Sequence, residues 1–220
     1  PTGCGQAAQP VISQHPRPRT TGLLLAAGAG RRFGQPKGTV VDADGAWVVR
    51  AARALLDGGC SDVLVVTGAQ AEEVEALLDS GLRGTRPDGA GSGTVATIRC
   101  GTWDQGMGES LRSGLTALAT RGRTTPLQAL VHLVDLPDVG PEVVARVLDG
   151  AGDGSDALGR AAYSGRPGHP VLLGRDHWEG VLAGAAGDAG ARGYLRRVPP
   201  RLVECGDLAS GADVDVPGGP

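Results

Sequence analysis

The chain has 220 residues, with 21 lysines and arginines, 24 aspartates and glutamates, and a formal net charge of −3. A net negative charge argues against binding of nucleic acid or anionic membranes through the overall charge of the protein. An anionic ligand therefore needs a local cluster of cations. The hydrophobic share of 40% is that of a globular protein with one sizeable core. Only 3% of residues are aromatic and 38 are glycine, which predicts an alanine, valine and leucine core joined by tight loops.

The first 20 residues are rich in proline and lack the cationic start and apolar middle of a signal peptide. We expect a disordered tail over 1–20, one domain over 21–217 and a short tail over 218–220. No apolar run approaches the ~20 residues that cross a bilayer. The four cysteines lack the spacing of a zinc site and are expected to be reduced thiols. These features predict a cytoplasmic protein with neither nucleic acid nor membrane as a partner.

Apolar runs alternate with amphipathic segments along the chain. Residues 22–27 (GLLLAA) are continuously apolar, which is typical of a strand buried on both faces. The helix expected over 46–59 ends at a glycine pair, which is a good C-terminal signal. The further expected elements are strand 62–68, helix 71–80, strand 94–99, helix 109–119, strand 129–135, helix 140–151, strands 157–163 and 169–174, a helix near 190–198 and strand 201–205. Strands alternating with helices predict a single α/β domain with a mostly parallel sheet.

A glycine turn with three cations follows the first strand. Gly28, Ala29 and Gly30 let the backbone approach an anion closely and direct its N–H groups toward it. Arg31, Arg32 and Lys37 then follow, with no acidic residue between 20 and 41. The arginine fork and the compact lysine charge both suit phosphate oxygens. The turn therefore predicts a phosphate site at the carboxyl end of the first strand.

Two familiar phosphate sites do not fit this turn. A dinucleotide-binding oxidoreductase needs its glycines to open directly into a helix, and Gly34 and Pro36 argue against a helix starting at Gly30. Its next strand should also end in an acid, whereas strand 62–68 ends in Thr67 and Gly68. A Walker loop needs a G-K-S/T sequence that is missing here.

Six segments, in order from 22 to 217, resemble the MobA-like NTP transferase family, and most closely its molybdenum cofactor cytidylyltransferases. They are LLLAAGAGRRFGQPKG, GMGESLRSGL, VDLPDV, GRPGHPVLLG, GDAGAR and DVDVP. The resemblance implies a Rossmann-like three-layer sandwich of the nucleotide-diphospho-sugar transferase type. It also implies transfer of a nucleoside monophosphate from an NTP to a phosphorylated acceptor, with release of pyrophosphate.

The resemblance assigns roles to residues of this chain. The expected catalytic residues are Arg32, with Arg31 as a second candidate, Lys37 and Asp135. The expected nucleotide-binding residues are Leu25, Ala26, Ala27, Gly28, Ala29, Gly30, Arg31, Arg32, Lys37, Gly68 and Ser110. Cations at the glycine turn would stabilise charge on the departing pyrophosphate, and positioning is the main further demand of such a displacement.

A magnesium ion is the expected cofactor. Asp135 would bind Mg²⁺, a hard ion that takes one or two carboxylates and leaves room for phosphate oxygens. Family comparison gives Asp215 as the second ligand, with Asp213 as the alternative. The family usually continues past this motif with an acidic pair, and Val216 stands where it has threonine.

The resemblance is less specific about the substrates. The resemblance at Ala27 favours CTP over GTP, and it implies molybdopterin as the acceptor and a molybdenum enzyme as a client. Met107 and His169 are the expected acceptor-binding residues, whereas His132, inside a strand, is expected only to pack. Two other functions stay open: a sugar- or alcohol-phosphate nucleotidyltransferase of the same fold, and a non-catalytic chaperone that binds a nucleotide or cofactor.

Overall fold

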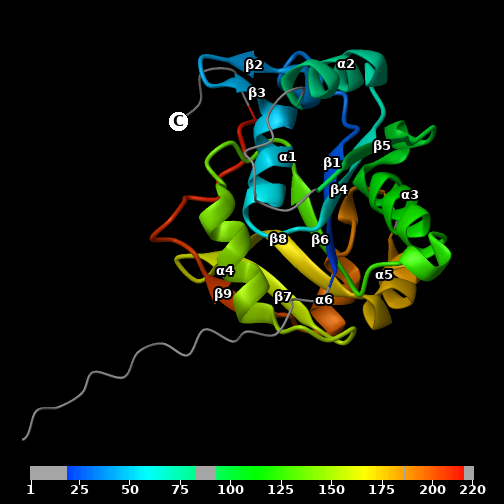
Figure 1. Cartoon of the computed structure of the whole chain (residues 1–220), viewed down its shortest axis with the longest axis vertical. Coiled ribbons are helices and arrows are strands. Elements are labelled where there is room, and N and C mark those ends of the chain that lie inside the picture. The colour runs from blue at the N-terminus through cyan, green and yellow to red at the C-terminus, as the bar shows by residue number, and fades with distance from the viewer. Residues whose placement is uncertain (1–18, 83–92, 186, 216–220) are drawn as a thin grey trace, which may run out of the picture.

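Seven strands form one sheet at the centre of the computed structural model, which describes residues 19–82, 93–185 and 187–215 (Figure 1). The strand order is β5-β4-β1-β6-β8-β7-β9, and only β8 runs antiparallel to its neighbours. The strands are β1 (Thr20–Ala26), β4 (Asp62–Thr67), β5 (Val95–Arg99), β6 (Gln128–Leu133), β7 (Leu158–Tyr163), β8 (Arg166–Gly174) and β9 (Arg201–Glu204).

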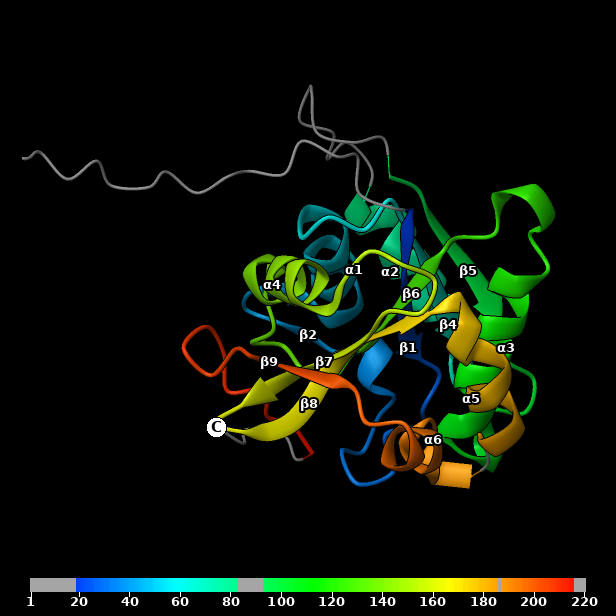
Figure 2. The same cartoon turned by 90° about the horizontal axis from the view of Figure 1, so that it is seen from below.

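Helices cover both faces of this sheet, which makes three layers (Figure 2). Successive β1 side chains alternate between two apolar cores: Leu24 packs with α1, α2 and α4, and Leu23 and Leu25 pack with α3, α5 and α6. The helices are α1 (Trp47–Asp57), α2 (Ala71–Leu82), α3 (Met107–Ala119), α4 (Pro141–Ala151), α5 (Trp178–Gly184) and α6 (Arg192–Arg197). The expected fold class, one α/β domain with a mostly parallel sheet, is confirmed.

The register of the central strands determines where functional residues can meet. Strand β1 is buried along its whole length between β4 and β6, as its continuous apolar run predicts. Ala26 pairs with Thr67 on one side, and Leu25 pairs with Leu133 on the other. The segments that follow these three strands therefore leave the sheet at the same edge, where ligands of open α/β sheets bind.

Several details differ from the sequence-based expectations. A hairpin of β2 (Val41–Asp42) and β3 (Gly45–Ala46), and helix α5, were not expected. Strand β6 ends two residues before Asp135, which therefore lies in the loop that follows. Strand β1 begins at Thr20, the last residue of the expected tail, while residues 1–18 lie outside the described part.

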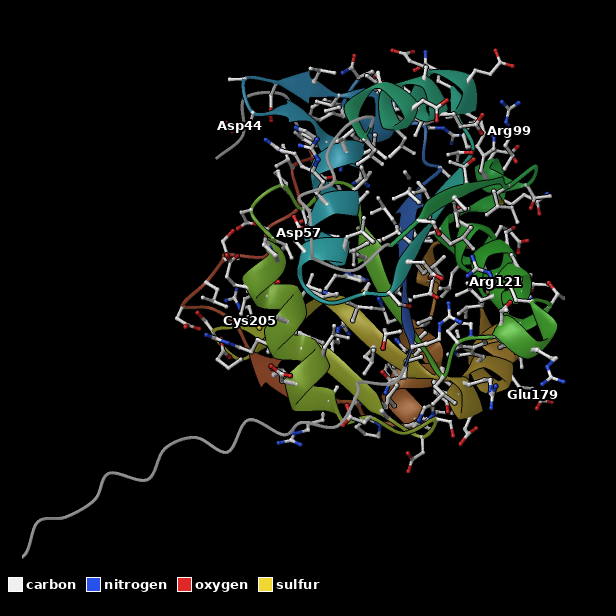
Figure 3. All side chains as sticks on the ribbon, viewed as in Figure 1. Asp44, Asp57, Arg99, Arg121, Glu179 and Cys205 are labelled. Atoms are coloured by element: carbon white, nitrogen blue, oxygen red, sulfur yellow. The ribbon has the colours of Figure 1, made fainter. Side chains whose placement is uncertain are left out.

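The exterior carries the charged side chains. Figure 3 shows Asp44, Arg99, Arg121 and Glu179 around the periphery, away from the central strand β1. The described cysteines Cys60, Cys100 and Cys205 are free thiols, as their spacing predicts. Within the described ranges, no helix is long and apolar enough to cross a membrane.

Candidate active site

A cavity of about 470 Å³ opens at the carboxyl ends of β1 and β6. One wall is the glycine turn, a second is the loop that contains Asp135, and a third is the start of α3. Its lining residues are Leu25, Ala27, Gly28, Ala29, Gly30, Arg31, Arg32, Lys37, Trp103, Asp104, Gly106, Met107, Ser110, Leu133, Val134, Asp135 and Asp188. Most of the residues that the sequence assigns to a nucleotide site therefore surround one space.

The glycine turn has a conformation that requires glycine at Gly30. Its φ is +58°, and a Cβ there would lie 1.9 Å from the Gln35 carbonyl oxygen. The Gly34 amide donates to the Gly30 carbonyl at 2.9 Å, which closes the turn. The chain then forms a short 3₁₀ helix, Lys37–Thr39, so no α-helix opens at Gly30, as Gly34 and Pro36 predict.

Lys37 lies between two carboxylates from distant parts of the chain. Its Nζ is 2.8 Å from Asp135 Oδ2 and 2.9 Å from Asp215 Oδ1. Burial alone lowers the pKa of Lys37, but its hydrogen bonds to both aspartates raise that pKa above the ordinary value. Arg32 lies on the outer side of the cluster, with Nη1 3.9 Å from Asp215 Oδ2. The hydrogen bond from Lys37 and its positive charge lower the pKa of Asp215.

The second oxygen of Asp135 fits a hard cation. Asp135 Oδ1 is buried and has no hydrogen-bond partner among the described residues. A buried carboxylate oxygen needs a partner, and a divalent ion bound together with phosphate oxygens supplies one. Asp215 lies on the far side of the Lys37 ammonium, whereas the exposed Asp213 has no ion pair with any described residue. The described residues hold no cluster of three or more metal-binding side chains, so substrate oxygens would complete the coordination.

Hydrogen bonds at Val214 and at Ser210 bring Asp215 to the site. The Val214 amide donates to the Asp135 carbonyl at 3.1 Å. Upstream, Asp138 Oδ2 accepts hydrogen bonds from the Ser210 amide at 2.7 Å and from the Ser210 hydroxyl at 2.6 Å. The segment Ser210–Asp215 is therefore held against the loop after β6 at both of its ends.

Another wall of the cavity, next to the turn, is built around Trp103. A Cβ on Gly68 would lie 2.6 Å from Trp103 Cγ and 2.7 Å from the Ala27 carbonyl oxygen, so glycine lets the indole approach the turn. Ser110 is buried on the first turns of α3, and Met107, at its start, is 37% exposed. Gly68 itself does not line the cavity, and Ala26 points into the core on the opposite face of the sheet.

A smaller cavity of about 70 Å³ adjoins the first and shares Leu25, Met107 and Asp188 with it. His169 lines this second cavity and not the first, together with Arg160 and Arg192. Burial lowers the pKa of His169 to about 3, and the neighbouring charges of Arg160, His132 and Arg192 add to that effect. The imidazole is therefore neutral at physiological pH.

The sequence reasoning missed three charged residues of these two cavities. Asp188 and Arg192 belong to the segment GDAGAR, whose motif was recognised without a role for its members. Arg160 stands inside strand β7, and only the pairing of β7 with β8 brings it near His169.

A family model for the MobA-like NTP transferase domain matches residues 22–202. The chain belongs to the MobA-like NTP transferase family. Membership of this family confirms the expected enzyme class, a nucleotidyltransferase. A curated relative, the nicotine blue oxidoreductase of Paenarthrobacter nicotinovorans, is 35% identical over 208 residues, which cover 90% of this chain and 93% of the relative.

Several solved structures share the fold of this chain. A homologue of Rv0371c from Mycobacterium sp. strain JC1 superposes with a TM-score of 0.66 at 23% identity, covering 91% of this chain and 92% of the other. A nucleotidyl transferase from Methanothermobacter gives a TM-score of 0.67 at 21% identity, with coverage of 90% and 92%. The 4-diphosphocytidyl-2C-methyl-D-erythritol synthase gives 0.62 at 17% identity, with coverage of 91% and 94%. At these identities the likeness concerns the fold alone.

Proposed function

We propose that the chain transfers CMP from CTP to a phosphorylated acceptor, molybdopterin being the favoured one, with Mg²⁺ as cofactor. The observation that carries the proposal is the Lys37 ammonium between Asp135 and Asp215, with Lys37 and Asp135 lining one cavity together with an acid-free glycine turn. This arrangement provides cations for a triphosphate and carboxylates for a divalent ion at the same edge of the sheet. The proposed cellular setting is the cytoplasm, with a molybdenum enzyme as client and no role for nucleic acid or membrane.

The reaction is an in-line displacement on the α-phosphorus. An oxygen of the acceptor phosphate forms the new bond, and the bond to the β-phosphate oxygen breaks, so pyrophosphate leaves with the electron pair. The N–H groups of the glycine turn and the side chains of Arg32 and Lys37 hold the triphosphate and neutralise charge on the leaving group. A bound magnesium ion would supply Lewis-acid polarisation of phosphate oxygens, with Asp135 and Asp215 as its protein ligands.

Base and acceptor would lie on opposite sides of the α-phosphate. Ala27, the residue before the first glycine, favours cytosine, and the indole of Trp103 beside it offers an apolar wall for the base. Met107 stands where the two cavities join and His169 lies in the second, which suits both to acceptor binding. Ser110, buried at the start of α3, is the proposed contact on the nucleotide side.

Calorimetric titration with CTP, GTP, ATP and UTP, each with and without Mg²⁺, tests the nucleotide part of this proposal. We expect CTP to bind most tightly and its affinity to rise in the presence of the ion. If no nucleotide binds more tightly with Mg²⁺, the metal-assisted function is wrong.

Release of pyrophosphate from CTP on addition of molybdopterin tests the chemistry. Asp135→Asn should lower turnover by orders of magnitude because it removes the anionic ligand, and Asp57→Asn, an exposed aspartate at the end of α1, should not. A non-catalytic chaperone would keep its nucleotide affinity in Asp135→Asn and release no pyrophosphate in either protein. Sugar phosphates and alcohol phosphates assayed in the same way would identify the other transferase alternative.

The name of the curated relative favours one second candidate, an oxidoreductase that acts on a compound such as nicotine blue. The glycine turn opens into no α-helix and β4 ends in Thr67, so the usual dinucleotide features are missing from the described residues. Oxidation of NADH or NADPH in the presence of a redox dye, followed at 340 nm, would support this candidate. Its dependence on Asp135 would separate the two functions, because hydride transfer has no use for the carboxylate pair.

A further inference from the structure

The second cavity combines two arginines with an apolar floor. Arg160 comes from β7 and Arg192 from the start of α6, while the floor is made by buried side chains of α3, β6, β8 and α6. These apolar residues are Leu111, Val131, Val171, Leu173 and Leu195. A ligand that fits here pairs an anionic group with an apolar or aromatic body.

Arg160 is held in place but its charge is not compensated. Its Nε donates to the Gly168 carbonyl at 2.7 Å, which leaves both terminal amino groups without a hydrogen bond to any described residue. Burial, and then the like charge of Arg192, lower the pKa of Arg160. Arg192 is exposed and forms no ion pair within the described ranges.

One carboxylate lies nearby, yet it does not neutralise the arginines. Asp188 lines both cavities and is the single acidic residue among the described residues that line the second. No ion pair joins it to Arg160 or Arg192 in the part of the chain that the structure describes. Two arginines that line one cavity beside a neutral His169 form an environment that an anion would stabilise.

We propose that Arg160 and Arg192 bind the phosphate monoester of the acceptor, while the glycine turn binds the triphosphate. This inference rests on the proposed function and deepens it. A phosphate dianion must approach an anionic triphosphate for the reaction, and cations on the acceptor side, separate from Arg32 and Lys37, offset that repulsion. The shared residues Leu25, Met107 and Asp188 join the two cavities, so an acceptor phosphate held by Arg160 faces the nucleotide.

Phenyl phosphate is a simple probe with the required chemistry, because it joins a phosphate to an aromatic body. Calorimetric titration of the full chain compares Arg160→Met, Arg192→Met and the matched control Arg166→Met, an exposed arginine of β8 outside both cavities. We expect about tenfold weaker binding in Arg160→Met and severalfold weaker binding in Arg192→Met, with Arg166→Met within twofold of wild type. Benzoate should bind more weakly than phenyl phosphate, because a carboxylate offers fewer acceptor oxygens.

A crossed measurement separates the two cavities. Arg32→Met should weaken CTP binding and leave phenyl phosphate binding unchanged, whereas Arg160→Met should do the reverse. If Arg160→Met does not fold, phenyl phosphate binding is measured instead with Arg160→Lys and with Arg192→Met, whose site is exposed. Equal phenyl phosphate affinity in Arg160→Met and Arg166→Met, or equal affinity for benzoate, would overturn the inference. Failure of CTP to bind with Mg²⁺, while phenyl phosphate binding still depends on Arg160, would instead overturn the proposed function alone.

Discussion

At the scale of single residues, Lys37 occupies the space between the two carboxylates that are suited to a metal. Its ammonium must therefore compete with a divalent ion for Asp135 and Asp215. In Lys37→Met the competition ends, and the two carboxylates repel each other until a cation binds. We expect Mg²⁺ alone to bind this variant several-fold more tightly than wild type and to raise its Tm further, although CTP binds less tightly.

Arg31→Met is the matched control for Lys37→Met. Arg31 lines the same cavity but forms no ion pair with a described carboxylate, so its removal should leave the response to Mg²⁺ unchanged. Equal Mg²⁺ affinity and an equal rise of Tm with Mg²⁺ in wild type and Lys37→Met would contradict the proposed competition between Lys37 and the ion.

Two glycines of the phosphate turn should respond differently to alanine. Gly28 has nothing within 4 Å of an added Cβ, whereas the same atom on Gly30 meets the Gln35 carbonyl at 1.9 Å and φ is +58°. We expect Gly28→Ala to keep the Tm of wild type and to weaken CTP binding, because its methyl group enters the cavity. Gly30→Ala should lower the Tm as well, since the turn itself must rearrange. Thermal unfolding and CTP titration of both variants check this, and equal losses of Tm would disprove it.

At the scale of elements, Asp138 positions the segment that delivers Asp215. Its Oδ2 accepts two hydrogen bonds from Ser210 and one from the Gly211 amide at 3.2 Å. Asp138→Ala should release this segment, and the Mg²⁺ concentration required for half-maximal CTP binding should then rise several-fold. Asp215→Ala should have at least the same effect.

Asp213→Asn is the internal control for these variants. Asp213 is exposed in the same segment and contacts no described cation, so it should behave like wild type in the Mg²⁺ titration. A loss in Asp213→Asn equal to that in Asp215→Ala would contradict the assignment of Asp215, rather than Asp213, as the second ligand.

Elements that bury a continuous apolar run or stripe could be predicted from the sequence. Strand β1 has a continuous apolar run and helix α1 has apolar residues at helical spacing. Both elements lie where these patterns predict them. The hairpin of β2 and β3 has only two residues in each strand, too few to show a period of two. The direction of β8 depends on its partners, and no local pattern encodes it. Asp215 meets Lys37 across 178 positions, which only the folded chain reveals.

At the scale of the whole molecule, the site lies at the sheet edge because the three central strands run parallel in a register that aligns their ends. The positions of the cation cluster and Asp135 could be predicted from this rule, since each lies in the loop that follows a strand. The second cavity could not be predicted in this way, because residues of the antiparallel strand β8 and of helix α6, near the end of the chain, form part of its lining. Residues assembled by long-range pairing are therefore the ones that the sequence assigned least well.

The stability of the whole fold should depend on the protonation of His132. This side chain is 0% exposed, and neither ring nitrogen has a hydrogen-bond partner among the described residues. Burial lowers its pKa from 6.5 to about 4, although the charge of Asp138 acts in the opposite direction. A base whose pKa falls on folding binds more protons when unfolded, so its contribution is complete above its unfolded pKa and is lost as pH falls.

The loss expected from His132 is about 2 kcal/mol of unfolding free energy between pH 7.5 and pH 5, obtained as the difference between urea unfolding curves of wild type and His132→Leu. His132→Leu fills a similar volume without a titratable group, so its unfolding free energy should fall less over the same interval. His169, whose pKa is lowered to about 3, also makes the unfolding free energy fall as pH falls, and this contribution is the same in both proteins. Parallel pH profiles for wild type and His132→Leu would refute the assignment of this slope to His132, because the two proteins differ in that group alone.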